Sequence, residues 1–213
     1  MTNNTLRTAA LIAAAVAPIF AQSAQAQPLE YPEGAEIPRS MTPAEQAFTK
    51  LNPIQAIQSR GAAPSALVRT PGEYEPAEGI IMAWEGSTSW RSILAQMTVA
   101  ITTTGEAKAF IFVDTASERT SASNQVAALG ADMSRVQFEI KRTDTIWARD
   151  YGPRYIFLGS SPDGTGGVRA IVDHTYNRPR PNDNGLPSYW ASDRNEPYFL
   201  IPLVHGGGNY HLE

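Results

Sequence analysis

Residues 144–153, DTIWARDYGP, place carboxylates on both sides of a tryptophan. A carboxylate such as Asp150 can accept paired hydrogen bonds from a guanidinium group, and the indole of Trp147 can stack on the same planar cation. The motif alone also allows a simpler interpretation. In that case Asp150 forms a structural ion pair with Arg149 or Arg154, and Trp147 belongs to the core.

Residues 176–183, YNRPRPND, set two arginines two positions apart. Pro179 and Pro181 disfavour helical backbone at the residues before them, so Arg178 and Arg180 are expected on the same side of an extended segment. Two guanidinium groups could then hold one carboxylate. A proline-stiffened loop with ordinary surface arginines is the alternative. Together the two motifs suit a ligand with a guanidinium at one end and a carboxylate at the other.

Cysteine and histidine, which bind metals or act as nucleophiles and bases in many enzymes, are absent or rare in this sequence. The sequence contains no cysteine, and its three histidines, His174, His205 and His211, match no common zinc spacing. The glycines at 206–208 follow a strand pattern but open no helix, so they do not form a dinucleotide fingerprint. They indicate a tight turn, or a place where backbone approaches a ligand closely. We therefore expect no metal and no other cofactor.

Three further acidic residues have less specific surroundings. Asp114, Asp173 and Asp183 fall at expected strand ends or turns, where aspartate commonly bonds nearby backbone. We assign them structural roles and not catalytic ones.

The N-terminus has the pattern of a secretory signal peptide at 1–26. A basic Arg7 precedes an apolar run at 9–21 and a small-residue cleavage site, AQA, at 24–26. The apolar run is too short to span a bilayer, so the mature protein is expected to be exported, periplasmic or extracellular, and free of the membrane. The chain has 17 basic and 21 acidic residues, which gives no reason to expect nucleic-acid binding.

The remaining sequence divides into a leader and an α/β domain. Residues 27–70 are rich in Pro, Ala and Gln and are expected to be extended, except for a helix that Thr42 and Glu45 begin as a capping box. From residue 71, hydrophobic periodicity alternates between strands and helices, which favours α/β layering. Strands are expected at 79–84, 108–113, 136–140, 154–158, 168–172 and 198–204, and helices at 89–103 and 116–129.

Several motifs in this order resemble the bacterial peptidylarginine deiminases of the Porphyromonas type. These belong with the agmatine deiminases in the guanidino-group-modifying superfamily. The matching segments are PGEYEP at 71–76, the strand at 79–84, WARDYGP at 147–153, IVD at 171–173, YNRPRPND at 176–183 and GGNY at 207–210. Any one of them is weak evidence, but together they are specific.

The resemblance implies a five-bladed α/β propeller of ββαβ repeats, of which residues 71–213 would hold the early blades. Asp150 would bind the substrate guanidinium, Trp147 would pack against the substrate, and Arg178 with Arg180 would hold the carboxylate of a C-terminal arginine. Such enzymes convert arginine to citrulline and ammonia through a covalent cysteine intermediate, with a histidine as general acid and base. Because this sequence has no cysteine, we expect it to be truncated before the nucleophile and inactive alone.

Two alternatives remain open. An agmatine deiminase of polyamine synthesis would share much of the pattern, but agmatine has no carboxylate for Arg178 and Arg180. Agmatine deiminases also usually carry Glu where this sequence has Gly206. The second alternative is a non-catalytic protein that binds guanidino or carboxylate groups. The expected partner is thus an arginine-containing peptide or a small guanidino compound.

Overall fold

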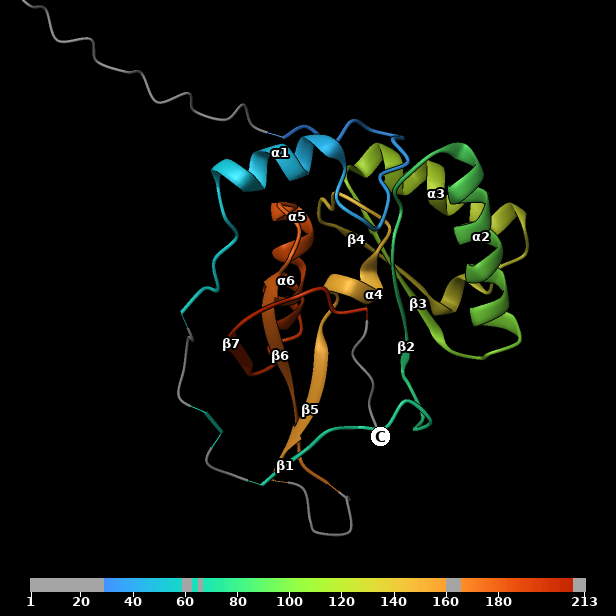
Figure 1. Cartoon of the computed structure of the whole chain (residues 1–213). Coiled ribbons are helices and arrows are strands. Elements are labelled where there is room, and N and C mark those ends of the chain that lie inside the picture. Colours follow the sequence, from blue (N-terminus) through green and yellow to red (C-terminus); the bar gives the residue numbers. More distant parts are fainter. Residues whose placement is uncertain (1–28, 59–62, 65–66, 160–165, 209–213) are drawn as a thin grey trace, which may run out of the picture.

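The computed structural model describes residues 29–58, 63–64, 67–159 and 166–208 (Figure 1). The expected signal peptide at 1–26 and the final motif residues Asn209 and Tyr210 lie outside these ranges, as does His211. Within the described ranges, every helix is too short or too polar for a membrane crossing.

The first half of the domain is a parallel sheet of three strands in the order β2-β3-β4. The two strand-to-strand connections contain the helices α2 and α3, and a short 3-10 helix, η1, precedes the last strand. The elements are β2 (Gly79–Ala83), α2 (Thr88–Thr103), β3 (Lys108–Val113), α3 (Ala116–Ala128), η1 (Met133–Arg135) and β4 (Val136–Ile140). All three strands and both long helices were predicted, with boundaries within a residue of those observed.

Strand β3 separates two cores because its side chains alternate between the faces of the sheet. Ala109, Ile111 and Val113 are fully buried on the side of α2 and α3. Phe110 and Phe112 point to the opposite side, where the second half of the chain packs. A strand that is buried on both faces explains the continuous apolar run at 108–113.

The second half contains a four-stranded sheet in the order β1-β5-β6-β7. Its members are β1 (Val68–Arg69), β5 (Arg154–Leu158), β6 (Val168–Tyr176) and β7 (Tyr198–His205). Strands β5 and β6 form the predicted antiparallel hairpin, whereas β7 runs parallel to β6. Strand β1, which pairs with the edge of β5, was not predicted from the sequence.

Aromatic side chains join the two sheets through the second of these cores, which contains Phe110 and Phe112. The indole of Trp190 meets Phe110 and Phe112 edge to face, with ring centroids 5.2 and 5.5 Å apart. Trp190 lies on one of three short helices, which are α4 (Ala148–Tyr151), α5 (Pro181–Asn184) and α6 (Leu186–Asp193). The fold is therefore mixed α/β, as predicted. Both sheets of the described residues are open, so the propeller is not confirmed.

The leader contains the expected helix, α1 (Pro43–Leu51). Thr42 Oγ1 accepts a hydrogen bond from the Glu45 amide at 3.2 Å, and Glu45 Oε2 accepts one from the Thr42 amide at 2.7 Å. This is the predicted capping box. In Figure 1, α1 and the segment before it run across one end of the domain, above α5 and α4. The leader thus packs on the domain.

Candidate functional site

Asp150 lies on α4, beyond the carboxyl end of β4, where α/β sheets usually place ligand sites. Its side chain is only 4% exposed, and its Oδ2 accepts a hydrogen bond from Nε of Arg39 at 3.0 Å. Of the neighbouring arginines, Arg149 pairs with Glu73 at 2.9 Å, and Arg154 donates to the main-chain oxygens of Gly152 and Asp150, at 3.0 and 3.4 Å. The acid expected to bind a guanidinium group thus binds one from the leader.

Trp147 lies one helical turn before Asp150 and is partly buried. Its indole Nε1 donates a hydrogen bond to the carbonyl oxygen of Ile37 at 2.9 Å. The ring also meets Trp90 edge to face, with centroids 6.0 Å apart. Trp147 therefore contributes to the core with one side and contacts the leader with its polar edge.

The two arginines of the second motif bind different acceptors. Arg180 has a fully buried side chain whose Nε and Nη2 donate to the two carboxylate oxygens of Glu45, at 2.7 and 3.1 Å. Arg178 is half-buried, and its Nε donates to the main-chain oxygen of Arg39 at 3.0 Å. The expected convergence on one carboxylate is not observed, although Arg180 has the non-helical backbone that was expected, with φ −114° and ψ 86° before α5.

The glycine turn after β7 packs directly on Asp150. A side chain at Gly208 would overlap both Oδ1 of Asp150 and Nη2 of Arg39. A side chain at Gly207 would overlap the main-chain oxygen of Asp150. The turn therefore brings backbone close to the Asp150 side chain, where only glycine fits; that a ligand lies there stays a prediction.

The loop between β4 and α4 is fixed by two aspartates that exchange backbone bonds. Asp183 Oδ1 accepts from the amides of Asp144 and Thr145, at 2.7 and 3.1 Å. Asp144 Oδ2 in turn accepts from the amide of Asn182 at 2.8 Å. Burial, together with the charge of Asp144, raises the pKa of Asp183 to about 7. Asp183 therefore has the structural role assigned to it from the sequence, and it ties the two motifs together.

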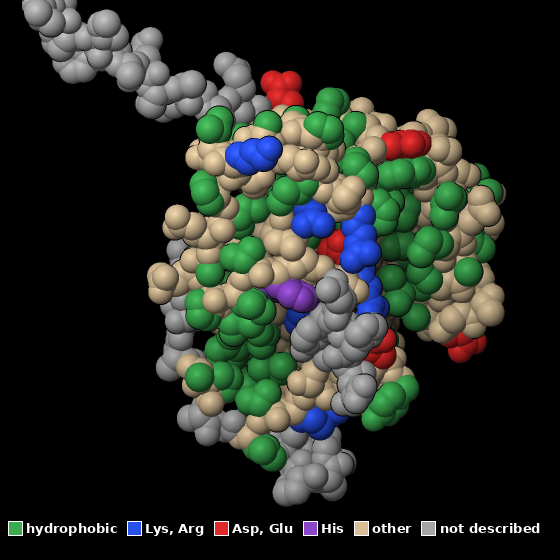
Figure 2. Space-filling model, in the orientation of Figure 1, with side chains coloured by type: hydrophobic (Ala, Val, Ile, Leu, Met, Phe, Trp, Pro, Cys, Tyr) green, Lys and Arg blue, Asp and Glu red, His purple; other side chains and the backbone are tan. Residues whose placement is uncertain are grey.

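Basic and acidic groups meet on the surface of this part of the molecule. On the face shown in Figure 2, Lys and Arg side chains gather around a small acidic surface, close to a histidine. Arg39 is the most accessible member of the site, with 53% of its side chain exposed, whereas Asp150 below it is buried.

Sequence reasoning missed three residues that contact or adjoin the site. Arg39 lies in the leader, 111 positions from Asp150, and no motif marked it. Glu45 was recognised only as a helix cap. Glu85 follows β2 at the carboxyl edge of the parallel sheet, and its position directly after a buried strand was an available signal. Its Oε1 accepts a hydrogen bond from the Thr143 hydroxyl at 2.9 Å.

Glu85 should make the free energy of unfolding fall as pH rises. Burial, and then the charge of Asp114, raise the pKa of Glu85 to about 9. The unfolded state loses this proton near the usual pKa of 4.5 and the folded state only near 9, so stability falls as pH rises between these values and levels off above 9. Between pH 7 and 9 we expect the free energy of unfolding to fall by up to about 1.4 kcal/mol per pH unit. Urea denaturation of the Glu85→Gln variant should show a flatter profile, and an unchanged slope would contradict this assignment.

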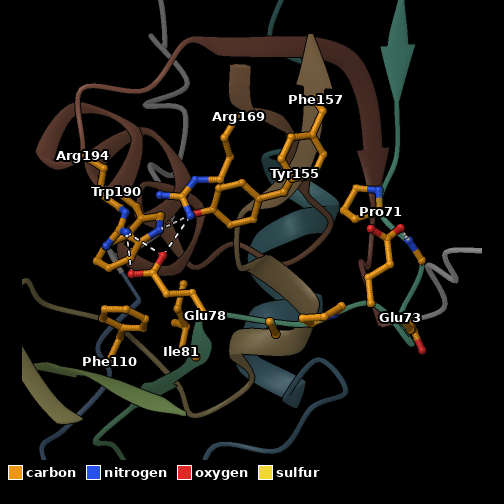
Figure 3. A pocket seen from close by; sticks show the side chains of 15 residues that line it. Pro71, Glu73, Glu78, Ile81, Phe110, Tyr155, Phe157, Arg169, Trp190 and Arg194 are labelled. Atoms are coloured by element: carbon orange, nitrogen blue, oxygen red, sulfur yellow. Dashed lines mark hydrogen bonds and ion pairs between the residues drawn. The ribbon is translucent and has the colours of Figure 1, made fainter. Parts of the chain in front are cut away.

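A separate pocket of about 280 Å³ lies between the two sheets. Figure 3 shows the Glu78 carboxylate pointing towards Arg169 and Arg194, beside the rings of Tyr155 and Trp190. Hydrogen bonds, with that from Arg169 the strongest, lower the pKa of Glu78 to about 2. The Glu78 carboxylate is therefore already paired with two arginines of the protein, Arg169 and Arg194. None of the four side chains predicted to bind substrate lines this pocket.

A family model described as Porphyromonas-type peptidyl-arginine deiminase matches residues 69–213. The chain belongs to this family. The match includes Asp150, Trp147, Arg178 and Arg180, so the resemblance inferred from the motifs is confirmed. Members of the family are deiminases, which are hydrolases acting on C–N bonds.

Solved structures of similar fold carry related names. An agmatine deiminase of C. jejuni with substrate bound has a TM-score of 0.52 and 16% identity, covering 70% of this chain and 44% of that one. A structure described as a putative peptidyl-arginine deiminase has a TM-score of 0.51 and 21% identity, covering 67% and 42%. A putative arginine deiminase from Porphyromonas gingivalis has a TM-score of 0.50 and 14% identity, covering 67% and 43%. The chain thus spans under half the length of these relatives.

Proposed function

We propose that this chain provides the arginine-binding part of a peptidylarginine deiminase site. The observation that carries the proposal is the contact between the buried Asp150 carboxylate and an arginine guanidinium, with 3.0 Å between Oδ2 and Nε of Arg39. A substrate arginine placed there would have its charge neutralised in a site where little water competes. Trp147 and Arg178 lie beside the same ligand position, because both bind the main chain around Arg39.

These residues would bind and orient the substrate. In the proposed reaction on a peptide arginine, a nucleophile attacks the guanidinium carbon, one guanidinium nitrogen leaves as ammonia, and water supplies the oxygen of the citrulline that remains. The 213 residues contain no cysteine, so the groups described here supply recognition and positioning. A carboxylate paired with the guanidinium fixes the orientation of its plane, and hence the face that can be attacked.

Binding to the purified chain tests this proposal. Acetyl-glycyl-arginine should bind when titrated calorimetrically, and acetyl-glycyl-lysine should bind at least about tenfold more weakly. The reason is that an ammonium group cannot make the paired, planar hydrogen bonds that a guanidinium makes with a carboxylate. Equal affinities for the two peptides would contradict guanidinium recognition.

The position of Arg178 favours peptidylarginine over agmatine as the substrate. Its Nε lies 3.0 Å from the main-chain oxygen of Arg39. In a C-terminal arginine the equivalent oxygen belongs to the carboxylate, and that charge would strengthen the hydrogen bond. Agmatine has no group at this position, so Arg178 would add little to its binding.

The Arg178→Ala variant should therefore separate the two substrates. We expect its affinity for acetyl-glycyl-arginine to fall about tenfold, since a hydrogen bond to a charged group contributes about 1.5 kcal/mol or more. Its affinity for agmatine should not fall, because agmatine has no group at this position. Calorimetric titration checks both values, with the exposed Arg119→Ala on α3 as the control. Similar losses for both ligands would remove Arg178 from carboxylate recognition.

We also propose the wider organisation that the motifs suggest. Residues 71–213 would form early blades of a five-bladed propeller, residues 27–70 a leader, and residues 1–26 a signal peptide for export. The fold likeness to deiminase structures supports the propeller assignment.

Export makes a further prediction about the mature N-terminus. When the gene is expressed in a bacterial host, the protein recovered outside the cytoplasm should begin at Gln27, because AQA at 24–26 fits the signal-peptidase pattern. Mass spectrometry of the intact protein measures this directly. Recovery of the protein with residues 1–26 still attached would contradict signal cleavage.

A further inference from the structure

The leader brings to the site the same two charges that a C-terminal arginine would bring. Arg39 presents a guanidinium group to Asp150, with 3.0 Å between Nε and Oδ2. Glu45 presents a carboxylate to Arg180, which binds both of its oxygens at 2.7 and 3.1 Å. The residues that bind these two charges, Asp150 and Arg180, are ones that the sequence motifs assign to substrate binding. Packing alone would not require the leader to place a cation at Asp150 and an anion at Arg180, as a C-terminal arginine would.

The site also binds the main chain on both sides of Arg39. Trp147 Nε1 donates to the carbonyl oxygen of residue 37, Arg178 Nε to that of residue 39, and Arg180 Nη2 to those of residues 38 and 40, at 2.8–3.2 Å. These hydrogen bonds recognise main-chain carbonyl groups, so they do not depend on which side chains flank the arginine. The bound segment is therefore held in the manner expected of a peptide ligand.

An external arginine cannot share this position with Arg39. Asp150 is 4% exposed, and the backbone of Gly208 packs against both its Oδ1 and the Arg39 guanidinium. The carboxylate thus has room for one guanidinium partner from the open side. Arg39 itself is 53% exposed, so its own ion pair can open at little cost, whereas displacement of the buried Glu45 requires the carboxylate of the peptide to take its place at Arg180.

We propose that residues 37–45 act as a pseudosubstrate, with Arg39 in the place of the substrate's arginine, so that a peptide arginine binds only by displacing them. The inference rests on the function proposed above for Asp150. It adds the substrate class, which is an arginine recognised together with its flanking main chain. It also adds a means of control, because release of the leader would raise the affinity of the site for external peptides.

The energetics follow from intramolecular competition. A tethered segment has an effective concentration on the order of millimolar, which is high compared with a dilute ligand. The observed affinity for a peptide equals its intrinsic affinity multiplied by the fraction of molecules in which the segment is open. A substitution that weakens the contacts of the segment, and leaves the residues that bind it unchanged, should therefore strengthen peptide binding.

Calorimetric titration of the full chain with acetyl-glycyl-arginine tests the proposal. Arg39→Gln removes the competing charge and leaves Asp150, Trp147 and Arg178 intact, so its affinity should rise at least about tenfold over wild type. The matched control, Arg119→Gln, alters an exposed arginine on α3 and should leave the affinity unchanged. In a parallel hydrogen-exchange experiment on the wild-type chain, the peptide should increase exchange of the amides in α1 and residues 37–42.

Each outcome has a definite meaning. Tighter binding by Arg39→Gln, with faster exchange of the leader in the wild type, supports the pseudosubstrate. Equal or weaker binding by Arg39→Gln overturns it, and so does peptide binding that leaves the leader protected. If Asp150→Asn abolishes binding in either of those cases, the proposed function survives without the pseudosubstrate. If no variant binds, or if Asp150→Asn binds like wild type, both proposals fall.

Discussion

Replacing Glu45 by alanine is expected to lower the free energy of unfolding by about 3–5 kcal/mol, because it leaves the fully buried guanidinium of Arg180 without its counter-ion. The same change removes the carboxylate that closes the capping box of α1. Both effects weaken the docking of the leader on the domain. Urea denaturation measures the loss.

The double variant Glu45→Ala, Arg180→Met is the control for this prediction. It removes both buried charges and replaces the guanidinium by an apolar chain of similar length, so most of the lost stability should return. Glu45→Ala with near wild-type stability would mean that the leader does not stay docked in solution. A double variant as unstable as the single one would show that the ion pair is not the cause.

Replacing Asp150 by asparagine is expected to lower the affinity for acetyl-glycyl-arginine about 10- to 100-fold, since it removes the charge that pairs with the guanidinium while keeping the shape of the side chain. The melting temperature should change little, because the partner of Asp150 in the folded chain is the half-exposed Arg39. Calorimetric titration and thermal unfolding of the one variant give both quantities.

A substitution of the same kind elsewhere calibrates this result. Asp193→Asn changes an exposed aspartate at the end of α6 and should alter neither affinity nor stability. If Asp150→Asn instead loses stability and keeps normal affinity, Asp150 is a structural partner of an arginine. That was the simpler interpretation of its motif.

Local sequence patterns were sufficient for most of the scaffold. Strands β3 and β4 were placed with the correct ends because their apolar residues alternate or run continuously between clear breaks. Helix α1 was found from its capping box, and α3 ends before Gly130, whose φ of 90° favours glycine. Helix α6 was missed, since Pro187 and three polar residues, Ser188, Ser192 and Asp193, weaken its apolar periodicity.

The candidate site shows where such reasoning ends. Asp150 and Trp147 are three residues apart, so their proximity follows from the motif. Their contacts with residues 37–40 join positions more than one hundred residues apart, and no local pattern reports such pairs. Glu45 has two roles, as a helix cap and as the partner of Arg180, and only the first is visible in its neighbours.

The central claim is that the Asp150 carboxylate binds the guanidinium of a peptide arginine. A crystal structure of the Arg39→Gln chain with acetyl-glycyl-arginine tests it most directly. We expect the ligand guanidinium within hydrogen-bond distance of Asp150, its carboxylate beside Arg178 and Arg180, and residues 37–45 displaced. The same peptide bound instead in the pocket around Glu78, with the leader still against Asp150, would contradict the account.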